Sequence, residues 1–554
     1  MKNTLKALIA RALESARVAG ALAIEEVPEV QVEVPREEGR GDLATNVAMT
    51  LARAARKPPR AIAETILAHL DDPKGLIRET EIAGPGFINV TFGAEAWRQR
   101  LLAIIEEGDA YGGCDLGGGR RVQVEFVSAN PTGPLHIGHG RGAATGDALA
   151  RVLEAAGYRV EREYYVNDAG GQMSTLGRSV RARYLELCGV DAPFPEDGYP
   201  GDYVTDVASE LRREHGERWV GADEDVAVAE LADLAGRRLL EEIRSDLAAF
   251  NIRFDVFTSE QQLRADGSVQ SAIDELAAAG AVYEQDGALW FRSSDFGDDK
   301  DRPVVKSDGE LTYFASDIGY HRSKFRRGFD VVVDVWGADH HGYVKRVAAA
   351  LEALGQAADR FRVVLVQIVN LTRDGVPVRM GKRSGEFVAL REVLDEVGPD
   401  LARFFFLMRK SDAQLDFDLE LARRQTAENP VFYVQYAHTR IAGIFRQADE
   451  KGVQRPEAGD AAVAVLGNDD ELALIRLLAE FPAVVEAAAT AFEPHRVVFY
   501  AQRLAGEFHR FYTRNKCVSD DPALTAGRLL LVRAVKQVIG RALELVGVSA
   551  PERM

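Results

Sequence analysis

One stretch in the first third of the chain reads as a strand, a polar loop, a helix and a second strand. Residues 121–127 alternate apolar and polar side chains, and the loop at 128–134 contains two prolines. A helix is expected over 138–156, and residues 159–166 are again strand-like. A strand–helix–strand order implies parallel strands joined by a right-handed crossover, so this stretch favours an α/β fold.

The same order of elements returns later in the sequence. A strand is expected at 331–335, a helix at 343–354 and a further strand at 361–369. Two such halves are typical of one doubly wound, parallel-sheet domain of the nucleotide-binding type. We therefore predict a Rossmann-like catalytic domain over 120–415, with an insertion at about 175–300.

Different patterns flank this domain. Residues 1–110 mix helical and strand-like periods and are followed by a glycine-rich stretch, which predicts an N-terminal α+β domain and a linker. From 416 to 554 the apolar spacing is helical, which predicts a C-terminal all-α domain.

The net charge and the cysteines limit the setting in which the chain works. A formal net charge of −18 by itself argues against a nucleic-acid partner, because phosphate binding needs positive surface. An acidic protein can still carry a local basic group. The three cysteines show no paired spacing, which predicts a reducing compartment and no structural metal.

The beginning of the sequence has two readings. Residues 1–20 are basic and alanine-rich, which fits either a transit peptide or the first helix of a folded domain. The direct run into strand-like sequence favours the helix. Because no apolar run approaches the length of a membrane span, we expect a cytoplasmic protein without membrane contact.

Residues 131–140 carry the first motif, between a predicted strand and its helix. Ligands bind at this place in α/β sheets, and the free N–H groups of a helix N-terminus attract phosphate. His136 and His139 can donate hydrogen bonds to a phosphate as charge develops on it, and Gly138 allows close approach. Two other readings stay open: a helix start with capping histidines, and a His-x-x-His metal site that no further ligand completes.

Two more stretches fit nucleotide chemistry. In residues 377–385, Arg379, Lys382 and Arg383 can close on a triphosphate and neutralise charge that moves toward pyrophosphate. A solvated basic turn is the alternative. Residues 336–343 form a glycine-containing turn with an aspartate that can accept the ribose hydroxyls of a nucleotide.

These motifs carry a family resemblance. Residues 124–139 resemble the signature of class I aminoacyl-tRNA synthetases in the form specific to arginyl-tRNA synthetases. Residues 379–383 resemble the class I Lys-Met-Ser-Lys-Ser loop but keep only its methionine and second lysine. Residues 337–340 resemble the Gly-x-Asp-Gln turn, with histidine in the glutamine place. The resemblance implies that His136, His139, Lys382 and Arg379 are catalytic, and that Gly138, Gly337, Asp339, His340 and Met380 bind ATP.

Recognition of arginine requires particular residues in the sequence. A guanidinium offers five fixed N–H donors, which buried carboxylates meet in a charge-assisted fork. Such a site rejects lysine or citrulline, which supports selectivity without editing. An exposed helix acid and a core ring are the alternative readings of Asp317 and Tyr313. The resemblance implies that arginine is bound by Glu125, Ser128, Asn130, Tyr313 and Asp317.

Aromatic and basic side chains gather in two stretches of the predicted helical domain. Such groups can stack on unpaired bases, although taken alone they are typical of amphipathic core helices. Both stretches resemble the family's anticodon-binding domain, and residues 1–110 resemble its additional N-terminal domain, which touches the tRNA elbow. The tRNA-binding residues that the resemblance implies are Tyr433, Tyr436, Arg440, Arg510, Arg514, Lys516 and Asn46.

The resemblance implies a two-step reaction. Arginine attacks the α-phosphorus of ATP, supplied with Mg²⁺, and the arginyl group then passes from the adenylate to the 3′ end of tRNA(Arg). It further implies that activation needs bound tRNA, and the short span between His136 and Arg379 leaves little room for an editing domain. We expect a monomer without a resident metal. Two rivals remain: a small-molecule nucleotidyl transferase, and a catalytically silent tRNA-binding paralogue.

Overall fold

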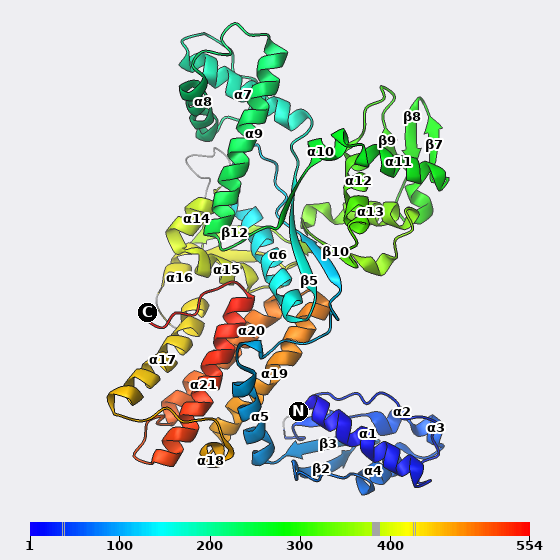
Figure 1. The fold of residues 1–554 in the computed structure, drawn as a ribbon, viewed down its shortest axis with the longest axis vertical. Coiled ribbons are helices and arrows are strands. Elements are labelled where there is room, and N and C mark those ends of the chain that lie inside the picture. Colours follow the sequence, from blue (N-terminus) through cyan, green and yellow to red (C-terminus); the bar gives the residue numbers. More distant parts are fainter. Residues whose placement is uncertain (36, 38, 379–387, 425, 427) are drawn as a thin grey trace.

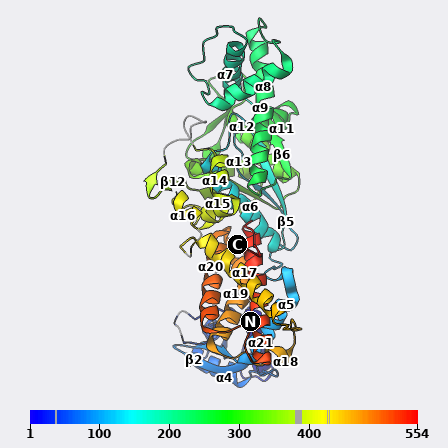
Figure 2. The same cartoon turned by 90° about the vertical axis from the view of Figure 1, so that its left-hand side faces the viewer.

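The structure is a computed structural model, which describes the whole chain except residues 36, 38, 379–387, 425 and 427. The described part is elongated, with the N-terminal domain and the long insertion helices at opposite ends in Figure 1 and in Figure 2. A parallel sheet lies between them, and a bundle of C-terminal helices lies between that sheet and the N-terminal domain (Figure 1). The predicted fold class is therefore confirmed, with an α+β, a doubly wound α/β and an all-α part.

The N-terminal domain packs helices against a three-stranded antiparallel sheet of order β1-β3-β2. Its first helix buries Leu5, Ile9 and Leu13, because their helical spacing places them on one face. The first helix thus belongs to a folded core. The elements are α1 (Lys2–Val18), β1 (Leu43–Thr45), α2 (Val47–Thr50), α3 (Ala52–Ala55), α4 (Pro59–Ala68), β2 (Ile77–Ala83), β3 (Phe87–Phe92) and α5 (Ala94–Glu107).

Five parallel strands form the central sheet in the order β11-β10-β4-β5-β6. Helix α6 (Ile137–Ala155) joins β4 to β5, and helix α13 (His341–Ala353) joins β10 to β11. The chain therefore leaves the neighbours β4 and β10 in opposite directions, and their carboxyl ends flank the crevice in which such sheets bind ligands. The strands are β4 (Arg121–Glu125), β5 (Arg159–Val166), β6 (Val256–Ser259), β10 (Val331–Gly337) and β11 (Phe361–Val366).

Two lobes leave the sheet between β5 and β10. One consists of three helices, and the other packs helices on an antiparallel sheet of order β7-β8-β9 (Figure 1). Strand β6 lies between the lobes in sequence and pairs with β5, so the region predicted as an insertion, about 175–300, includes one strand of the central sheet. The elements are α7 (Gly171–Leu187), α8 (Asp202–His215), α9 (Glu224–Ala249), α10 (Glu260–Ala265), α11 (Ser268–Ala278), β7 (Val282–Gln285), β8 (Ala288–Phe291), β9 (Arg302–Val305) and α12 (Tyr313–Arg326).

A small third sheet and a helical bundle complete the chain. Strand β12 pairs with β13 and β14 beside the central sheet. Among the described residues, no helix is both long and apolar enough to cross a membrane. The elements are β12 (Val369–Arg373), β13 (Val376–Pro377), α14 (Leu390–Val397), α15 (Pro399–Leu407), β14 (Leu415–Asp418), α16 (Leu419–Arg423), α17 (Pro430–Glu450), α18 (Asp460–Val463), α19 (Asp469–Ala491), α20 (His495–Arg514) and α21 (Pro522–Leu545).

A buried arginine joins three of these parts. Arg403 on α15 is fully buried, and its guanidinium donates to Asp147 on α6. It also donates to the carbonyl oxygen of Phe250, after α9, and to that of Val546, after α21, both at 3.0 Å. One side chain thus connects the helix of the first motif with the insertion and the C-terminal bundle.

We predict that Arg403→Met destabilises the fold. Removing one partner of a buried ion pair typically costs about 3–5 kcal/mol, because the remaining charge is left in a low-dielectric site. The free energy of unfolding, from denaturant titration, measures this loss. Arg17→Met is the matched control, since Arg17 pairs with Glu14 on the surface and its loss should cost less than about 1 kcal/mol. Equal losses for both variants would contradict the proposed junction.

Candidate active site

The loop after β4 holds a strained backbone conformation. Val127 and Ser128 have φ values of 68° and 43°, a region that β-branched residues rarely enter. The Ser128 hydroxyl donates to Glu125 Oε1 at 2.9 Å and accepts the Tyr165 N–H at 3.1 Å. Strain of this kind costs roughly 1–3 kcal/mol per residue and is concentrated at functional sites.

His136 and His139 form a stacked pair at the start of α6, with ring centroids 3.6 Å apart. His136 Nδ1 accepts the Gly138 N–H at 3.1 Å, and His139 Nδ1 accepts the His136 N–H at 3.2 Å. A nitrogen that accepts carries no proton, so each neutral ring is protonated at Nε2. Both histidines therefore cap the helix, as one of the alternative readings expected.

Burial keeps this pair neutral. It lowers the pKa of His136, and it lowers the pKa of His139 to about 3, with a further contribution from the neighbouring His136. At neutral pH both rings are uncharged N–H donors at the positive end of the α6 helix dipole. This arrangement suits an oxyanion better than a metal ion.

Three carboxylates lie in a row across the central sheet. Asp334 on β10 is the register partner of Glu125 on β4, which is in turn the partner of Glu163 on β5. All three are buried, and like charges on neighbouring strands repel. The row therefore requires cations from another element.

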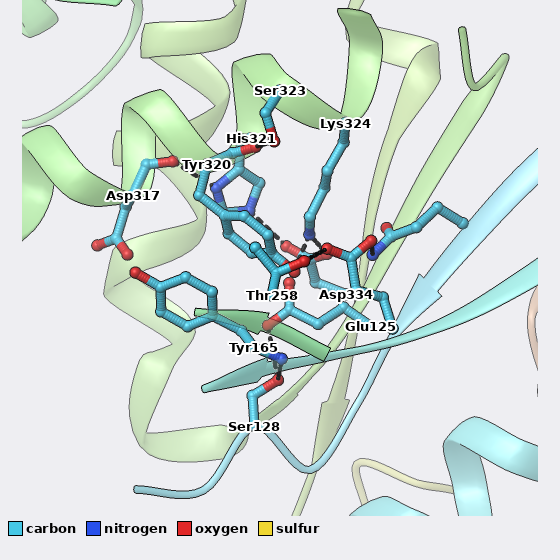
Figure 3. Close-up of polar contacts among 12 residues, drawn as sticks. Glu125, Ser128, Tyr165, Thr258, Asp317, Tyr320, His321, Ser323, Lys324 and Asp334 are labelled. Atoms are coloured by element: carbon cyan, nitrogen blue, oxygen red, sulfur yellow. Dashed lines mark hydrogen bonds and ion pairs between the residues drawn. The ribbon is translucent and has the colours of Figure 1, made fainter. Parts of the chain in front are cut away.

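Helix α12 and the residue after it place basic side chains at every third position, and Figure 3 shows the two on the helix, His321 and Lys324. His321 Nε2 lies 2.7 Å from the β10 carboxylate, and Lys324 Nζ bridges the β4 carboxylate and, at 2.8 Å, the β10 carboxylate. Arg327 donates to the β5 carboxylate. Side chains three apart share one helix face, so one face of α12 neutralises the whole row.

The same cluster has metal-ligand spacing. Ligand atoms of Glu125, His321 and Asp334 all lie within 4.8 Å of one another. The Lys324 ammonium already bonds both carboxylates of this group, so an internal cation takes the part that a metal ion would otherwise play.

Asp317 lies one helical turn before this cluster. Its Oδ2 accepts the Tyr343 hydroxyl, and within the described part of the chain no cation lies within ion-pair distance of it. Burial raises the pKa of Asp317 to about 6, although the bond from Tyr343 lowers it. Tyr313, one turn earlier, is 59% exposed, and Asn130 donates to Gln172 on α7. Asp317 is thus not an exposed helix acid, and Tyr313 is not a core ring.

The turn after β10 reaches the same sheet edge. A Cβ at Gly337 would lie 2.4 Å from Asp339 Oδ1, so a side chain there would displace the Asp339 carboxylate. The side chains of Asp339 and His340 are 82% and 58% exposed, with 3.7 Å between His340 Nε2 and Asp339 Oδ2. The turn presents its carboxylate to solvent at the ligand crevice.

Residues 379–383 lie outside the described part of the structure, and with them Arg379, Met380 and Lys382. The residues that follow do pair with the first motif. The Val388 carbonyl accepts the N–H of the first residue of α6 at 3.1 Å. The chain therefore returns from the second motif next to the stacked histidines.

An aromatic patch lies on α17 and α20. The Arg440 guanidinium lies 4.5 Å from the ring centre of Tyr436 and 4.8 Å from that of Tyr512. It donates to His509 Nδ1 at 3.1 Å, and His509 Nε2 donates to the Tyr433 carbonyl at 3.1 Å. The other tRNA-binding candidates are Arg510, Arg514 and Lys516, exposed on or just after α20, and Asn46, half-buried before α2.

The sequence matches three family descriptions that together span most of its length. They are "Arginyl tRNA synthetase N terminal domain" over residues 3–92, "tRNA synthetases class I (R), catalytic domain" over 101–412, and "DALR anticodon binding domain" over 434–554. The arginine–tRNA ligases of Citrifermentans bemidjiense and a Geobacter species are each 53% identical to the chain, and each match covers 100% of both sequences. The chain belongs to the arginyl-tRNA synthetase family.

Solved structures agree with this family. A putative arginyl-tRNA synthetase from Campylobacter jejuni superposes with a TM-score of 0.76 at 34% identity, covering 84% of this chain and 100% of that one. The arginyl-tRNA synthetase of Thermus thermophilus has the same TM-score at 23% identity over the full length of both chains, which supports the fold. Membership of this family rules out the first rival, a small-molecule nucleotidyl transferase.

Several residues around this synthetase's crevice were not among the site residues predicted from the sequence. Lys324, His321 and Asp334 form the buried ionic cluster, and Tyr343 holds Asp317. Cations at every third position of a helix normally indicate a solvated face. Only the register of β10 with β4 reveals that this face meets buried carboxylates.

We predict that Gly138→Ala slows adenylate formation. A Cβ at this position would lie 2.9 Å from His136 Cε1 and would displace the stacked ring. Loss of one positioned donor to a developing oxyanion costs roughly 10²–10³ in rate, and we expect at least about a tenfold fall in arginine-dependent pyrophosphate exchange. Gly142→Ala is the control on the same helix, since a Cβ there meets nothing within 4 Å. If both variants retain full exchange, the histidine pair does not act in this step.

Proposed function

We infer that the chain ligates arginine to tRNA(Arg) with ATP, as its full-length relatives do by name, and we propose that the crevice between β4 and β10 performs the chemistry. The observation that carries this proposal is the pairing of two neutral imidazole donors with one uncompensated carboxylate, Asp317, around the same crevice. The first group suits phosphate, and the second suits a guanidinium.

We propose that MgATP binds with its α-phosphate at the start of α6. His136 and His139 donate from Nε2 as negative charge develops on that phosphate, and Gly138 admits the nucleotide. Lys382 and Arg379, from the segment that ends beside α6, neutralise the pyrophosphate that leaves. Gly337, Asp339, His340 and Met380 complete the nucleotide site, with Asp339 accepting ribose hydroxyls.

We propose that arginine binds on the other side of the α-phosphate. Asp317 receives the guanidinium in a charge-assisted fork, with Glu125 as a second acceptor. Ser128 fixes Glu125, and Tyr313 and Asn130 close on the substrate. The carboxylate of arginine then faces the α-phosphorus, and orientation together with electrostatic stabilisation carries the rate without a covalent enzyme intermediate.

The domains divide the recognition of tRNA between them. We assign residues 416–554 to the anticodon, where Tyr433, Tyr436 and Arg440 offer a stacking surface. Arg510, Arg514 and Lys516 contact the phosphate backbone beside it. Residues 1–110, with Asn46, contact the elbow, and residues 120–415 hold the acceptor end for transfer of the arginyl group. We propose a monomer without an editing domain.

Charging of total tRNA with each labelled amino acid tests the function. Arginine should be incorporated, and no other amino acid should be. Arginine-dependent pyrophosphate exchange should start only when tRNA(Arg) is added, because we propose that bound tRNA completes the site. Full exchange without tRNA would refute this dependence and leave the ligase activity standing.

The pKa of Asp317 gives the arginine site a pH dependence. Burial raises this pKa to about 6, and only the ionised carboxylate can pair with a guanidinium. As pH falls through 6 the carboxylate takes up a proton, so kcat/KM for arginine should fall about tenfold per pH unit below that value. The KM for ATP should show no such change at low pH. In the Asp317→Asn variant, kcat/KM for arginine should lose this acid limb, the fall below pH 6. An acid limb shared by both substrates would assign the titration to another group.

A further inference from the structure

Lys324 is a fully buried ammonium at the centre of the site. Its Nζ donates to Glu125 Oε2 and, at 2.8 Å, to Asp334 Oδ1, and it lies 4.3 Å from the ring centre of Tyr320. Figure 3 shows the lysine descending from α12 onto the carboxylates of β4 and β10. No step of the proposed reaction uses this residue.

The contacts of Glu125 explain what Lys324 can do. Each carboxylate oxygen offers two lone pairs. The Ser128 hydroxyl occupies one lone pair of Oε1, and Lys324 occupies one lone pair of Oε2. These two bonds hold the carboxylate from two sides. Each oxygen keeps one lone pair that neither bond uses.

Every carboxylate of the row has a basic partner without substrate. The three carboxylates, on β10, β4 and β5, contact His321, Lys324 and Arg327, and Arg327 also pairs with Glu161. Both ring nitrogens of His321 have a partner: Nδ1 lies 2.7 Å from the Asp317 carbonyl oxygen, and Nε2 lies 2.7 Å from Asp334 Oδ2. The Asp317 carboxylate, by contrast, has no cation within ion-pair distance among the described residues.

We propose that Lys324 is a positioning residue for arginine recognition: it holds Glu125 in place and is the internal counter-charge of the β4 and β10 carboxylates, so that Asp317 is left to pair with the guanidinium. The inference rests on the proposed function, because it takes Glu125 and Asp317 as the arginine acceptors. Without Lys324, Glu125 and Asp334 would repel each other across adjacent strands.

The electrostatics agree with this geometry. Burial raises the pKa of Glu125, and Lys324 is the largest influence that opposes it. Burial alone would also raise the pKa of Asp334, but Lys324 and His321 hold it at about 2. Loss of the ammonium should therefore let Glu125 take up a proton within the working pH range. The ionisable groups that face this region are Glu125 from β4, Glu163 and Tyr165 from β5, Glu260 from α10, Asp317, Tyr320 and His321 from α12, Arg327 after it, Asp334 from β10 and Tyr343 from α13.

Three variants of the full-length protein test the inference: Lys324→Met, Glu125→Gln and the double variant. We expect Lys324→Met to raise the KM for arginine about tenfold, equal to about 1.4 kcal/mol, with little change in kcat or in the KM for ATP. The acid limb of kcat/KM for arginine should move to higher pH. A merely structural role would lower the active fraction, and hence kcat, and leave the arginine KM and the pH profile unchanged.

The double variant keeps the test valid if Lys324→Met does not fold. It removes one positive and one negative charge together, so no buried charge is left unpaired by that exchange. If Lys324 acts through Glu125, the KM for arginine of the double variant should match that of Glu125→Gln within about twofold. A value about tenfold higher would mean that Lys324 acts by another route and would overturn the inference.

Arg327→Met is the matched charge control. It removes a cation of the same row, but its ion pairs are with Glu161 and Glu163 on β5 and not with Glu125. The arginine KM should stay within about threefold of the unaltered protein. An equal rise in both charge variants would show a general effect of net charge and overturn the specific role. Failure of the unaltered protein to charge tRNA with arginine would instead refute the proposed function.

Discussion

The row of carboxylates across β10, β4 and β5 is the constraint on which the rest of the site depends. Three buried acids in register would repel one another, so the fold requires a cationic helix face directly above them. Helix α12 meets that need with cations at every third position. Because Asp317 lies one turn before His321 on the same helix, the docking of α12 also fixes the acid proposed to receive arginine.

The histidines of the first motif, at the other side of the crevice, meet a different electrostatic requirement. A charged imidazole would attract ATP before and during reaction alike, which strengthens binding more than it accelerates chemistry. Burial instead keeps His139 neutral, with its pKa at about 3, and the Nδ1 contacts place the proton of each ring on Nε2. Such donors gain strength only as the phosphate acquires charge. The strained residues 127 and 128 hold the loop between these two parts of the site.

Much of the fold followed from local sequence patterns. The strand expected at 159–166 has those bounds, and the helix expected over 138–156 is α6 within one residue at each end. Strand β6 was not foreseen, since four residues between two helices give no clear period. The motif residues could be proposed as a site, whereas Lys324 could not. Its neighbours in sequence resemble a solvated helix face, and its burial depends on strand order and register, which no local pattern records.

A chain with a net charge of −18 can still offer a surface for RNA, because the two contributions to such binding have different requirements. Stacking needs aromatic faces and is indifferent to the charge of the whole molecule. The aromatic patch provides such faces, with Arg440 held between two rings. Phosphate contacts need mobile cations. Arg510 and Arg514 are exposed, and in the described part of the chain they pair with Glu507 and Asp470, each at 3.2 Å. Exposed pairs of this kind contribute less than about 1 kcal/mol, so either arginine can exchange its carboxylate for a phosphate at little cost in free energy.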